Sequence, residues 1–448
     1  MHPAKVAKIA QRRLAQRLCE QRTFAAVVMP IRKTMPTTKH QDTRSQRAIK
    51  LESKFGAHNY HPLPVVLERG EGVFLWDVEG KRYYDFLSAY SAVNQGHCHP
   101  KIIAALTEQA KKLTLTSRAF FNDVLGEYEE YVTGFFGYDK VLPMNTGAEA
   151  VETAMKLARK WGYKVKGIPR DQARIIVCSG NFHGRTISII SASVDPDARA
   201  DYGPYTPGID VIPYDNLPAL QRALEHPHVA AFLVEPIQGE AGVMVPHAGY
   251  LKEAYEACKA RNVLFMADEV QTGIGRTGKL LACEHEGIRP DVLILGKALS
   301  GGVYPVSAVL ANDDIMLTIK PGEHGSTFGG NPVAGRVGIA ALEVIKEEKL
   351  TENAAKLGEV FRASMQKLVD EFGWVTLVRG KGLLNAVIIE PRKDGRTAWD
   401  LCLLLAEHGL LAKPTHGDII RFAPPLVMNR QQLDECCAII HQCVKAFH

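Results

Sequence analysis

Asp268 and Lys297 each stand at the end of an apolar run that reads as a buried strand. Asp268 closes residues 264–267, and Lys297 follows residues 293–295 and precedes a glycine-rich turn. Burying an unpaired carboxylate is costly, so Asp268 needs a partner or a function; taken alone, it would be a helix N-cap. A partly buried lysine has a lowered pKa and becomes a nucleophilic amine suited to Schiff-base chemistry, whereas an isolated Lys297 would be an ordinary surface lysine.

The segment 145–150, Asn-Thr-Gly-Ala-Glu-Ala, opens a predicted helix over residues 148–161. The unpaired N–H groups and the dipole of a helix N-terminus favour a phosphate dianion, although an ordinary N-cap would explain the same residues. Together, the three segments describe a pyridoxal-phosphate site, with the phosphate on the helix, Asp268 on the pyridine nitrogen and Lys297 on the aldehyde. Such a site belongs at the carboxyl ends of the strands of an open α/β sheet.

The spacing of apolar residues predicts the elements that position these groups. Short apolar strands alternate with helical segments from about residue 95 to 340, which predicts a mostly parallel sheet covered by helices on both faces. The predicted strands are residues 174–178, 231–235, 263–267, 291–295 and 306–310, and the predicted helices are 148–161, 250–261 and 332–348. Further predictions are a hairpin over 73–87 turning at Glu79-Gly80, strands near 375–378 and 384–389, and a last helix after Asn429.

These patterns predict an α/β fold with a large and a smaller domain. Residues 96–336 form the predicted large, cofactor-binding domain, which holds the mostly parallel central sheet. Residues 46–95 and 337–448 form the predicted smaller α/β domain, so that both ends of the chain contribute to it. Residues 1–45 are set apart as a basic leader.

Composition excludes several classes of protein. The chain has 448 residues, of which 46% are hydrophobic and 23% charged, as in a globular protein of two or three structural units. No run of 18 apolar residues occurs, so no contact with a membrane through a spanning helix is expected. Nine scattered cysteines are typical of reduced thiols, and His97-Cys98-His99 is not expected to bind a metal.

The net charge of +5 arises at the N-terminus. Residues 1–50 hold 12 Lys and Arg against two acidic residues, so the remainder carries 42 basic and 47 acidic residues. A basic body that binds nucleic acid is therefore not predicted. The acid-poor leader, with apolar residues at near-helical spacing, is typical of an organelle transit peptide and favours the mitochondrial matrix; the alternative is a basic extension on a cytoplasmic protein.

Six segments, in this order, resemble a known family. They are NTGAEA at 145–150, NFHGRT at 181–186, VEPIQGE at 234–240, ADEVQTG at 267–273, GKALSGG at 296–302 and STFGGNP at 326–332. Their content is similar to that of the class III, fold-type I aminotransferases, and the resemblance extends from about residue 59 to 425. It implies a pyridoxal 5′-phosphate cofactor and a transaminase reaction.

Within this class, residues 58–64, 88–96 and 411–425 resemble the ornithine aminotransferases. That resemblance implies transfer of the δ-amino group of L-ornithine to 2-oxoglutarate, which gives glutamate 5-semialdehyde and glutamate by a ping-pong mechanism. It also implies a role in arginine metabolism and proline biosynthesis.

The resemblance assigns cofactor-binding roles to ten residues. Lys297 would bind the cofactor aldehyde, Asp268 the ring nitrogen and Gln271 the phenolic oxygen. Phe182 would stack on the ring, with His183 beside it where some ornithine enzymes carry Trp. The implied set is Gly147, Ala148, Phe182, His183, Asp268, Val270, Gln271, Lys297, Ser326 and Thr327. Ser326 and Thr327 would reach the phosphate of the neighbouring subunit, which implies a homodimer or a higher oligomer.

Five further residues would bind substrate. Tyr60 and Arg185 would receive the α-amino and α-carboxylate groups of ornithine, so that the distal amine meets the cofactor, and Tyr90 would line the same channel. Glu240 and Arg421 would pair while ornithine binds and separate when Arg421 receives the carboxylate of glutamate or 2-oxoglutarate.

Four alternatives to this interpretation are open. Acetylornithine and 4-aminobutyrate aminotransferases belong to the same class, but their substrates offer no free α-amine to Tyr60. A catalytically inactive aminotransferase fold that acts as a binding protein is disfavoured because Lys297, Asp268, Arg185 and Glu240 are all present. A hydride-transfer enzyme is excluded because no G-x-G-x-x-G follows a strand.

Overall fold

The structure is a computed structural model that describes residues 42–447. The chain divides into two units, Met1–Arg47 and Ala48–His448, and the second unit holds the strands and most of the helices of the described residues. The predicted leader, residues 1–45, lies almost wholly outside the described residues.

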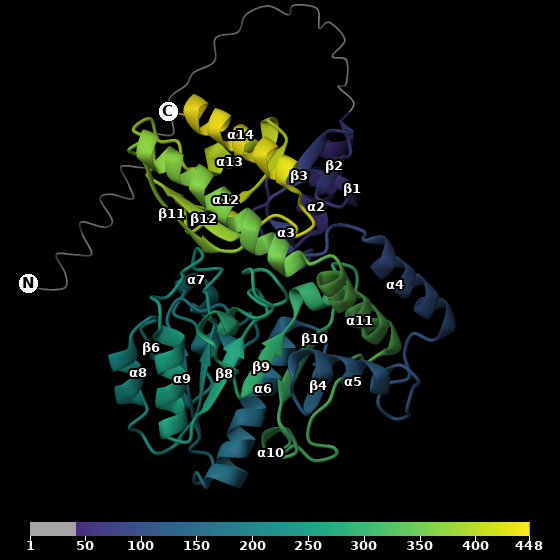
Figure 1. Cartoon of the computed structure of the whole chain (residues 1–448), viewed down its shortest axis with the longest axis vertical. Helices are drawn as coiled ribbons and strands as arrows, with labels where there is room; N and C mark the ends of the chain where they lie inside the picture. Colours follow the sequence, from purple (N-terminus) through teal and green to yellow (C-terminus); the bar gives the residue numbers. More distant parts are fainter. Residues whose placement is uncertain (1–41, 448) are drawn as a thin grey trace, which may run out of the picture. The chain divides into compact units, whose positions relative to one another are not determined.

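A seven-stranded sheet forms the centre of the second unit (Figure 1). Its order is β4-β10-β9-β8-β7-β5-β6, and the five strands from β9 to β6 run parallel to one another. β10 is antiparallel to both of its neighbours. The strands are β4 (Lys140–Met144), β5 (Arg174–Cys178), β6 (Ile209–Ile212), β7 (Val229–Val234), β8 (Leu264–Asp268), β9 (Val292–Leu295) and β10 (Ser307–Ala311). The predicted mostly parallel sheet is thus confirmed, with β4 and β6 as additional strands.

Alternating side chains bury both faces of this sheet. In β5, Ile175 and Val177 pack with helix α6 (Gly147–Trp161), while Ile176 faces the opposite way. That opposite face is covered by helices α8 (Leu217–Ala223) and α9 (Tyr250–Ala260). Because water reaches neither face, the strands are continuously apolar, which is why sequence reasoning located them.

The remaining helices of the central part surround this layer. Helix α5 (Leu125–Phe136) contacts β4, and α11 (Pro332–Glu347) contacts α5 and packs along α4 (Pro100–Lys112). The shorter elements are the π-helix η1 (Gly162–Lys166), the 3-10 helices η2 (Ile189–Ala192), η3 (Ala282–Glu286) and η4 (Lys297–Ser300), and the helices α7 (Pro196–Arg199) and α10 (Asp313–Met316).

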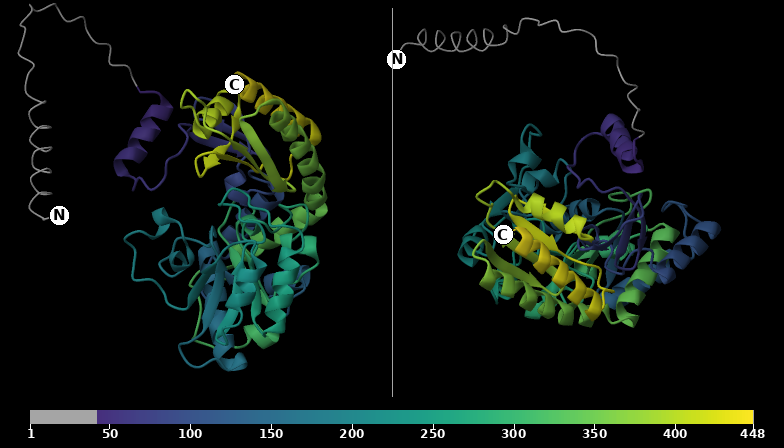
Figure 2. Two further views of the ribbon diagram at one scale, coloured as in Figure 1. Left: turned by 90° about the vertical axis from the view of Figure 1, so that its left-hand side faces the viewer. Right: turned by 90° about the horizontal axis from the view of Figure 1, so that it is seen from above.

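Two smaller sheets join the ends of the chain. The first consists of β1 (Leu67–Glu71), β2 (Phe74–Asp77), β3 (Arg82–Asp85) and β13 (Leu410–Leu411), so residues more than 300 positions apart pair in it. The second consists of β11 (Val375–Lys381), β12 (Leu384–Ile389), β15 (Ile419–Phe422) and β14 (Lys413–Thr415). Figure 2 shows α12 (Leu350–Glu371) and α14 (Arg430–Phe447) side by side over this sheet, with α13 (Ala398–Glu407) next to α14.

These sheets confirm the predicted hairpin, since β2 and β3 pair antiparallel, and the predicted strands and last helix near the C-terminus. The fold class is therefore the predicted one, an α/β fold with a mostly parallel central sheet and a smaller α/β part built from both ends. The exact domain boundaries stay a prediction. Helix α2 (Arg44–Phe55) precedes this fold.

The short element α3 (Ser88–Ser91) is a left-handed turn. Ser88, Ala89, Tyr90 and Ser91 have φ of 49°, 45°, 60° and 78°, a region that L-residues with a Cβ rarely adopt. The carboxylate of Asp85 accepts the N–H groups of Leu87 at 2.8 Å and Ser88 at 2.9 Å, which holds the chain at the entrance to the turn. This left-handed backbone conformation costs about 1–2 kcal/mol per residue, and it sets the position of Tyr90.

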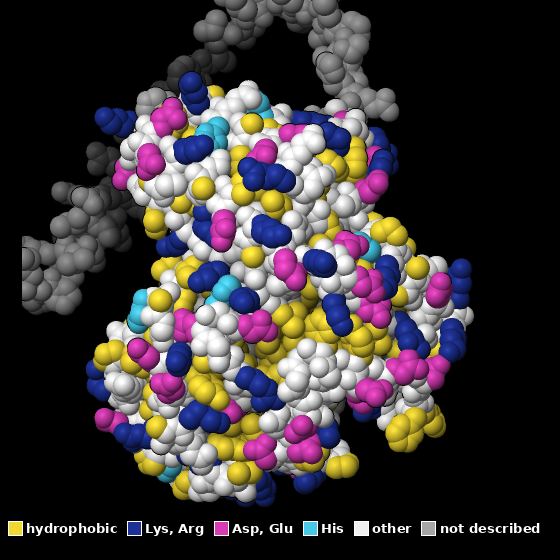
Figure 3. Space-filling model, viewed as in Figure 1, with side chains coloured by type: hydrophobic (Ala, Val, Ile, Leu, Met, Phe, Trp, Pro, Cys, Tyr) yellow, Lys and Arg dark blue, Asp and Glu magenta, His cyan; other side chains and the backbone are white. Residues whose placement is uncertain are grey.

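Charges of both signs are interspersed on the face seen in Figure 3, in agreement with the small net charge of the chain beyond its leader. Among the described residues, no helix is both long and apolar enough to cross a bilayer.

Candidate active site

A cavity of about 240 Å³ opens at the carboxyl ends of four neighbouring strands, and we call it the cofactor cavity. Phe182 lies beyond β5, Glu235 follows β7, Asp268 ends β8 and Lys297 lies beyond β9. Nine of the residues predicted from sequence line this one cavity: Gly147, Ala148, Phe182, His183, Glu240, Asp268, Val270, Gln271 and Lys297. The parallel sheet therefore brings together side chains that lie up to 150 positions apart.

Asp268 is 4% exposed, and both of its oxygens are engaged. Oδ1 accepts the N–H of Val270 at 3.1 Å, and Oδ2 lies 2.7 Å from Nδ1 of the buried His183. Burial lowers the pKa of His183, but the hydrogen bond and charge of Asp268 outweigh this effect and raise it above its usual value. His183 is thus a hydrogen-bonding partner of Asp268, a contact that the predicted place beside the cofactor ring did not include.

Glu235 is a fully buried carboxyl group in the same cavity that sequence reasoning missed. Its Oε1 accepts the N–H of Phe182 at 2.7 Å. Burial raises the pKa of Glu235 to about 7; His183 and Lys297 oppose this rise, and Asp268 adds to it. The sequence held a usable signal, because Glu235 directly follows a fully buried strand, as Asp268 ends another.

Lys297 begins the turn after β9 and has a backbone φ of 42°. This strained backbone conformation sets the direction in which its side chain leaves the chain. Burial lowers the pKa of its ammonium group, and Arg421 contributes in the same direction. Asp268, Glu235 and Glu240 oppose the decrease. A partly buried lysine of this kind loses its proton more easily than a surface lysine, which suits a nucleophilic amine.

The first turn of α6 forms the end of the cavity where a phosphate would bind. Thr146 and Glu149 form a capping box: Thr146 Oγ1 accepts the N–H of Glu149, and Glu149 Oε2 accepts the N–H of Thr146 at 3.0 Å. The N–H groups of Gly147 and Ala148 lie between these two, in a turn where no helix carbonyl can accept them. They are therefore available to an anion.

Ser326 lies near the same turn within its own chain. Its Oγ accepts a hydrogen bond from Asn145 Nδ2 at 2.8 Å and another from the N–H of Gly329 at 3.1 Å. Thr327 is exposed. The predicted reach of Ser326 and Thr327 to a neighbouring subunit stays a prediction.

Close approaches in the cavity fit a bound planar group. A Cβ on Gly239 would stand 1.3 Å from Gln271 Oε1, so only glycine leaves room for the Gln271 amide. That oxygen is buried without a hydrogen-bond partner among the described residues. Val270 closes the opposite side, 3.0 Å from where a Cβ of Gly147 would lie. An unsatisfied amide beside a lysine and a helix N-terminus matches pyridoxal phosphate, which has a ring oxygen, an aldehyde and a phosphate.

Glu240 and Arg421 form an ion pair at the rim of the cavity. Arg421 Nη1 lies 2.8 Å from Glu240 Oε2, and its guanidinium lies 4.7 Å from the centre of the Tyr90 ring. Arg421 is 4% exposed, whereas the Glu240 side chain is 35% exposed. Burial raises the pKa of Tyr90; Arg421 opposes this rise, while Glu240 and Tyr60 add to it. The structure thus brings together Tyr90, Glu240 and Arg421 as predicted from sequence.

Tyr60 and Arg185 lie at the outer side of the site. Tyr60 is 77% exposed and close enough to Tyr90 to influence its ionisation. Arg185 is exposed, lines a cleft that also contains Phe182 and Glu240, and stacks over the Phe182 ring at 5.4 Å. Both side chains are free to turn toward a ligand.

His97 and His99 are each bound by a carboxylate. Nε2 of His97 lies 2.8 Å from Asp85, and Nε2 of His99 lies 2.8 Å from Glu348. Over residues 42–447, no three potential ligands gather in a way that could hold a metal ion.

Comparison with known proteins identifies the family. Residues 55–444 match the family described as aminotransferase class-III, and the chain belongs to it. Members are transaminases that depend on pyridoxal 5′-phosphate, in agreement with the cofactor cavity.

Individual relatives are similar over nearly their whole length. The mitochondrial ornithine aminotransferase of Drosophila melanogaster is 64% identical, with 91% of this chain and 94% of the relative covered. The structure of the ornithine aminotransferase from Toxoplasma gondii ME49 has a TM-score of 0.89 and 48% identity, with 91% and 96% covered. That of an acetylornithine aminotransferase from Elizabethkingia anophelis has a TM-score of 0.83 and 61% identity, with 91% and 100% covered.

We predict that Glu235→Gln removes a pH dependence of stability. Below an unfolded pKa near 4.5 the carboxyl is protonated in both states, and above about 7 it is charged in both. Between these values the carboxyl is ionised in the unfolded chain but still protonated in the folded protein, so rising pH favours unfolding and the wild type loses on the order of 3 kcal/mol relative to the variant. Thermal unfolding of apoprotein from pH 4.5 to 8 measures this difference. The exposed Glu225→Gln is the control, and a stability difference between wild type and Glu235→Gln that stays constant with pH would contradict the burial of an ionisable carboxyl.

Proposed function

We propose that this protein transfers the δ-amino group of L-ornithine to 2-oxoglutarate, giving glutamate 5-semialdehyde and glutamate. The Glu240–Arg421 pair is the observation that carries this proposal. Ornithine has one carboxylate, whereas glutamate and 2-oxoglutarate have two. Arg421 would pair with Glu240 while ornithine is bound, and with the second carboxylate of glutamate or 2-oxoglutarate when one of these is bound. Its positive charge is neutralised in both cases, so one site accommodates both kinds of substrate.

Bound in the cofactor cavity, pyridoxal phosphate supplies an electron sink that stabilises a carbanion at the amine-bearing carbon of the substrate. The N–H groups of Gly147 and Ala148 would hold its phosphate, and Gln271 its phenolic oxygen. Phe182 would lie against the ring. Asp268, fixed by Val270 and His183, would keep a proton on the ring nitrogen.

Lys297 acts as nucleophile and then as acid and base in this proposal. Its lowered pKa favours the neutral amine, which is the form that would bind the cofactor aldehyde. When free of the cofactor, the same amine would take a proton from the amine-bearing carbon of the substrate and give it back afterwards. The carboxylates of Asp268 and Glu235 stabilise the ammonium form that exists between the two transfers.

Tyr60 and Arg185 would orient ornithine. The guanidinium of Arg185 forms a fork that fits a carboxylate, and the Tyr60 hydroxyl would accept a hydrogen bond from the α-ammonium group. With the α-carbon held at the rim, the δ-amine is the amine that reaches the cofactor. Neither acetylornithine nor 4-aminobutyrate has a free α-amine, so the tyrosine favours ornithine among the three donors.

We further propose that the enzyme works as a homodimer, in which Ser326 and Thr327 contribute to the partner's phosphate site. Exposed aromatic side chains support the proposal that a second chain covers this region. Phe120, Phe121 and Phe328 are 74%, 103% and 49% exposed, more than isolated chains usually leave in water.

Lys297→Ala is expected to abolish transamination while leaving the cofactor bound without a covalent link. Wild-type protein should be yellow, and reduction with borohydride should attach the cofactor to Lys297, as peptide mapping would show. Attachment to another lysine would contradict the assignment.

Tyr60→Phe tests the choice of substrate. The variant loses one hydrogen bond to a charged group, worth roughly 1.5–3 kcal/mol, so kcat/KM for ornithine should fall about 10- to 150-fold. Activity toward 4-aminobutyrate should hold or increase, and the half-reaction with glutamate should change little. An amino-donor panel with 2-oxoglutarate measures all three.

Tyr255→Phe, on α9 and outside the cofactor cavity, is the matched control for that panel. Equal losses of activity toward ornithine and 4-aminobutyrate in Tyr60→Phe would mean that Tyr60 is structural and does not select the donor.

We also propose import into the mitochondrial matrix. The basic leader supports this proposal, as does the Drosophila melanogaster relative, which is named mitochondrial. A reporter fused to residues 1–45 should enter mitochondria. Diffuse cytoplasmic signal together with an uncleaved N-terminus on the native protein would favour the cytoplasmic alternative.

A further inference from the structure

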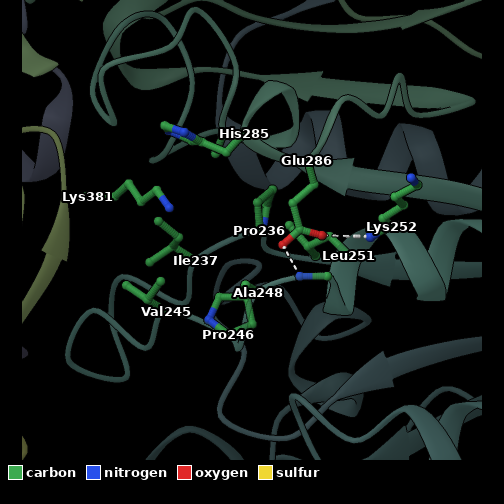
Figure 4. A pocket seen from close by; sticks show the side chains of 12 residues that line it. Pro236, Ile237, Val245, Pro246, Ala248, Leu251, Lys252, His285, Glu286 and Lys381 are labelled. Atoms are coloured by element: carbon green, nitrogen blue, oxygen red, sulfur yellow. Dashed lines mark hydrogen bonds between the residues drawn. The ribbon is translucent and has the colours of Figure 1, made fainter.

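A second cavity, which we call the rear cavity, lies behind the loop that carries Glu240. Its volume is about 430 Å³. Residues 236–248 form one wall, the first turn of α9 and helix η3 form others, and the end of β11 closes the remaining side. Figure 4 shows the apolar side chains Ile237, Val245, Pro246 and Leu251 facing it. This size is in the range of sites for small molecules.

One cation is directed into this apolar space. Lys381, the last residue of β11, extends its ammonium group toward Ile237 in Figure 4. In the part of the chain that the structure describes, Lys381 has no carboxylate partner. Lys252 also lines the cavity, but its ammonium group turns away from it in Figure 4. Lys381 is therefore the lining residue whose ammonium group is directed into the cavity.

The other polar groups of the wall are already engaged. Glu286 accepts the N–H groups of Gly249 at 3.1 Å and Lys252 at 2.8 Å, and thus caps α9. Nε2 of His285 faces the carbonyl of Thr277 at 3.1 Å. Burial lowers the pKa of His285, and Lys381 adds to this effect, so the ring is neutral at physiological pH.

We propose that the rear cavity binds a small monocarboxylate with an apolar body. Its carboxylate would meet Lys381, and its hydrocarbon part would lie against Ile237, Val245 and Pro246. A dianion such as phosphate fits poorly, because Glu286 occupies the helix N–H groups and only one cation is present. An amino acid fits poorly as well, because no free carboxylate awaits an ammonium group.

An occupant would act on the Glu240–Arg421 pair through the shared wall. Arg379 donates to the carbonyl of Gly242 at 2.9 and 2.7 Å, and Thr415 Oγ1 donates to that of Glu240 at 3.1 Å. Arg379 and Lys381 are two positions apart on β11 and so project from the same face. A ligand bound between Lys381 and the loop that carries Glu240 would add contacts that hold this loop against β11.

This coupling rests on the proposed function, in which Glu240 must leave Arg421 when 2-oxoglutarate binds. A ligand that binds more tightly while the pair is closed stabilises the closed form. It therefore slows the half-reaction with glutamate or 2-oxoglutarate and leaves the ornithine half-reaction unchanged.

Calorimetric titration of the full-length holoenzyme with 4-methylpentanoate tests the site directly. Saturable binding is expected, and 4-methylpentanamide should bind at least about tenfold more weakly, because it lacks the charge. Lys381→Met should weaken binding of the carboxylate by about tenfold or more. The exposed Lys279→Met, outside the cavity, is the matched control and should bind as wild type.

A second variant places the ligand. Ala248 is exposed and lines the cavity, so Ala248→Phe fills the space without disturbing the core and should also weaken binding. Binding that survives both Lys381→Met and Ala248→Phe would place the carboxylate outside the rear cavity and overturn the proposal.

Single-turnover kinetics then test the coupling. The probe should slow the glutamate half-reaction of wild type and Lys279→Met, and have no such effect on Lys381→Met. Binding without this selectivity would overturn the coupling. If ornithine proves not to be a donor while the probe still binds through Lys381, the proposed function fails and the site stands.

Discussion

Three charged groups held out of water at the ends of neighbouring strands are the constraint on which this structure depends. Glu235, Asp268 and Lys297 follow or end β7, β8 and β9, which are adjacent in the central sheet. None of them would be stable there alone, because each loses most of its hydration. The attraction between Lys297 and the two carboxylates, together with His183 and the backbone N–H groups of Phe182 and Val270, offsets that cost. The sheet must therefore keep these strand ends in register.

The same arrangement makes the site chemically versatile. Burial moves the pKa of Glu235 upward and that of Lys297 downward, so the two values approach each other. This approach lowers the cost of moving a proton between the two groups. Surface pairs would not behave in this way, because water would screen each charge from the other.

Much of the fold and of the cofactor cavity could be predicted from the sequence, because buried parallel strands are continuously apolar and end at polar residues. β5 and β12 were located to the residue, and nine predicted site residues line one cavity. The antiparallel direction of β10 was not foreseen, since an apolar run carries no sign of its direction. Glu235 was missed because the functional role in this motif was assigned to Glu240, which lies five residues later. The bond between His183 and Asp268 depends on how the loop after β5 meets the end of β8, which no local pattern records.

The left-handed turn at residues 88–91 limits how this protein can vary. Ser, Ala and Tyr have no preference for positive φ, so the rest of the fold, including the Asp85 carboxylate, must hold the turn in place. The Cα–Cβ direction of Tyr90 is consequently fixed by the main chain and not by the choice of rotamer. Exchanging the side chain at this position would alter what lies against the Arg421 guanidinium while its point of attachment stays where it is. The surroundings of Arg421 can thus diverge among descendants of one scaffold through changes at a single codon, without any rebuilding of the backbone.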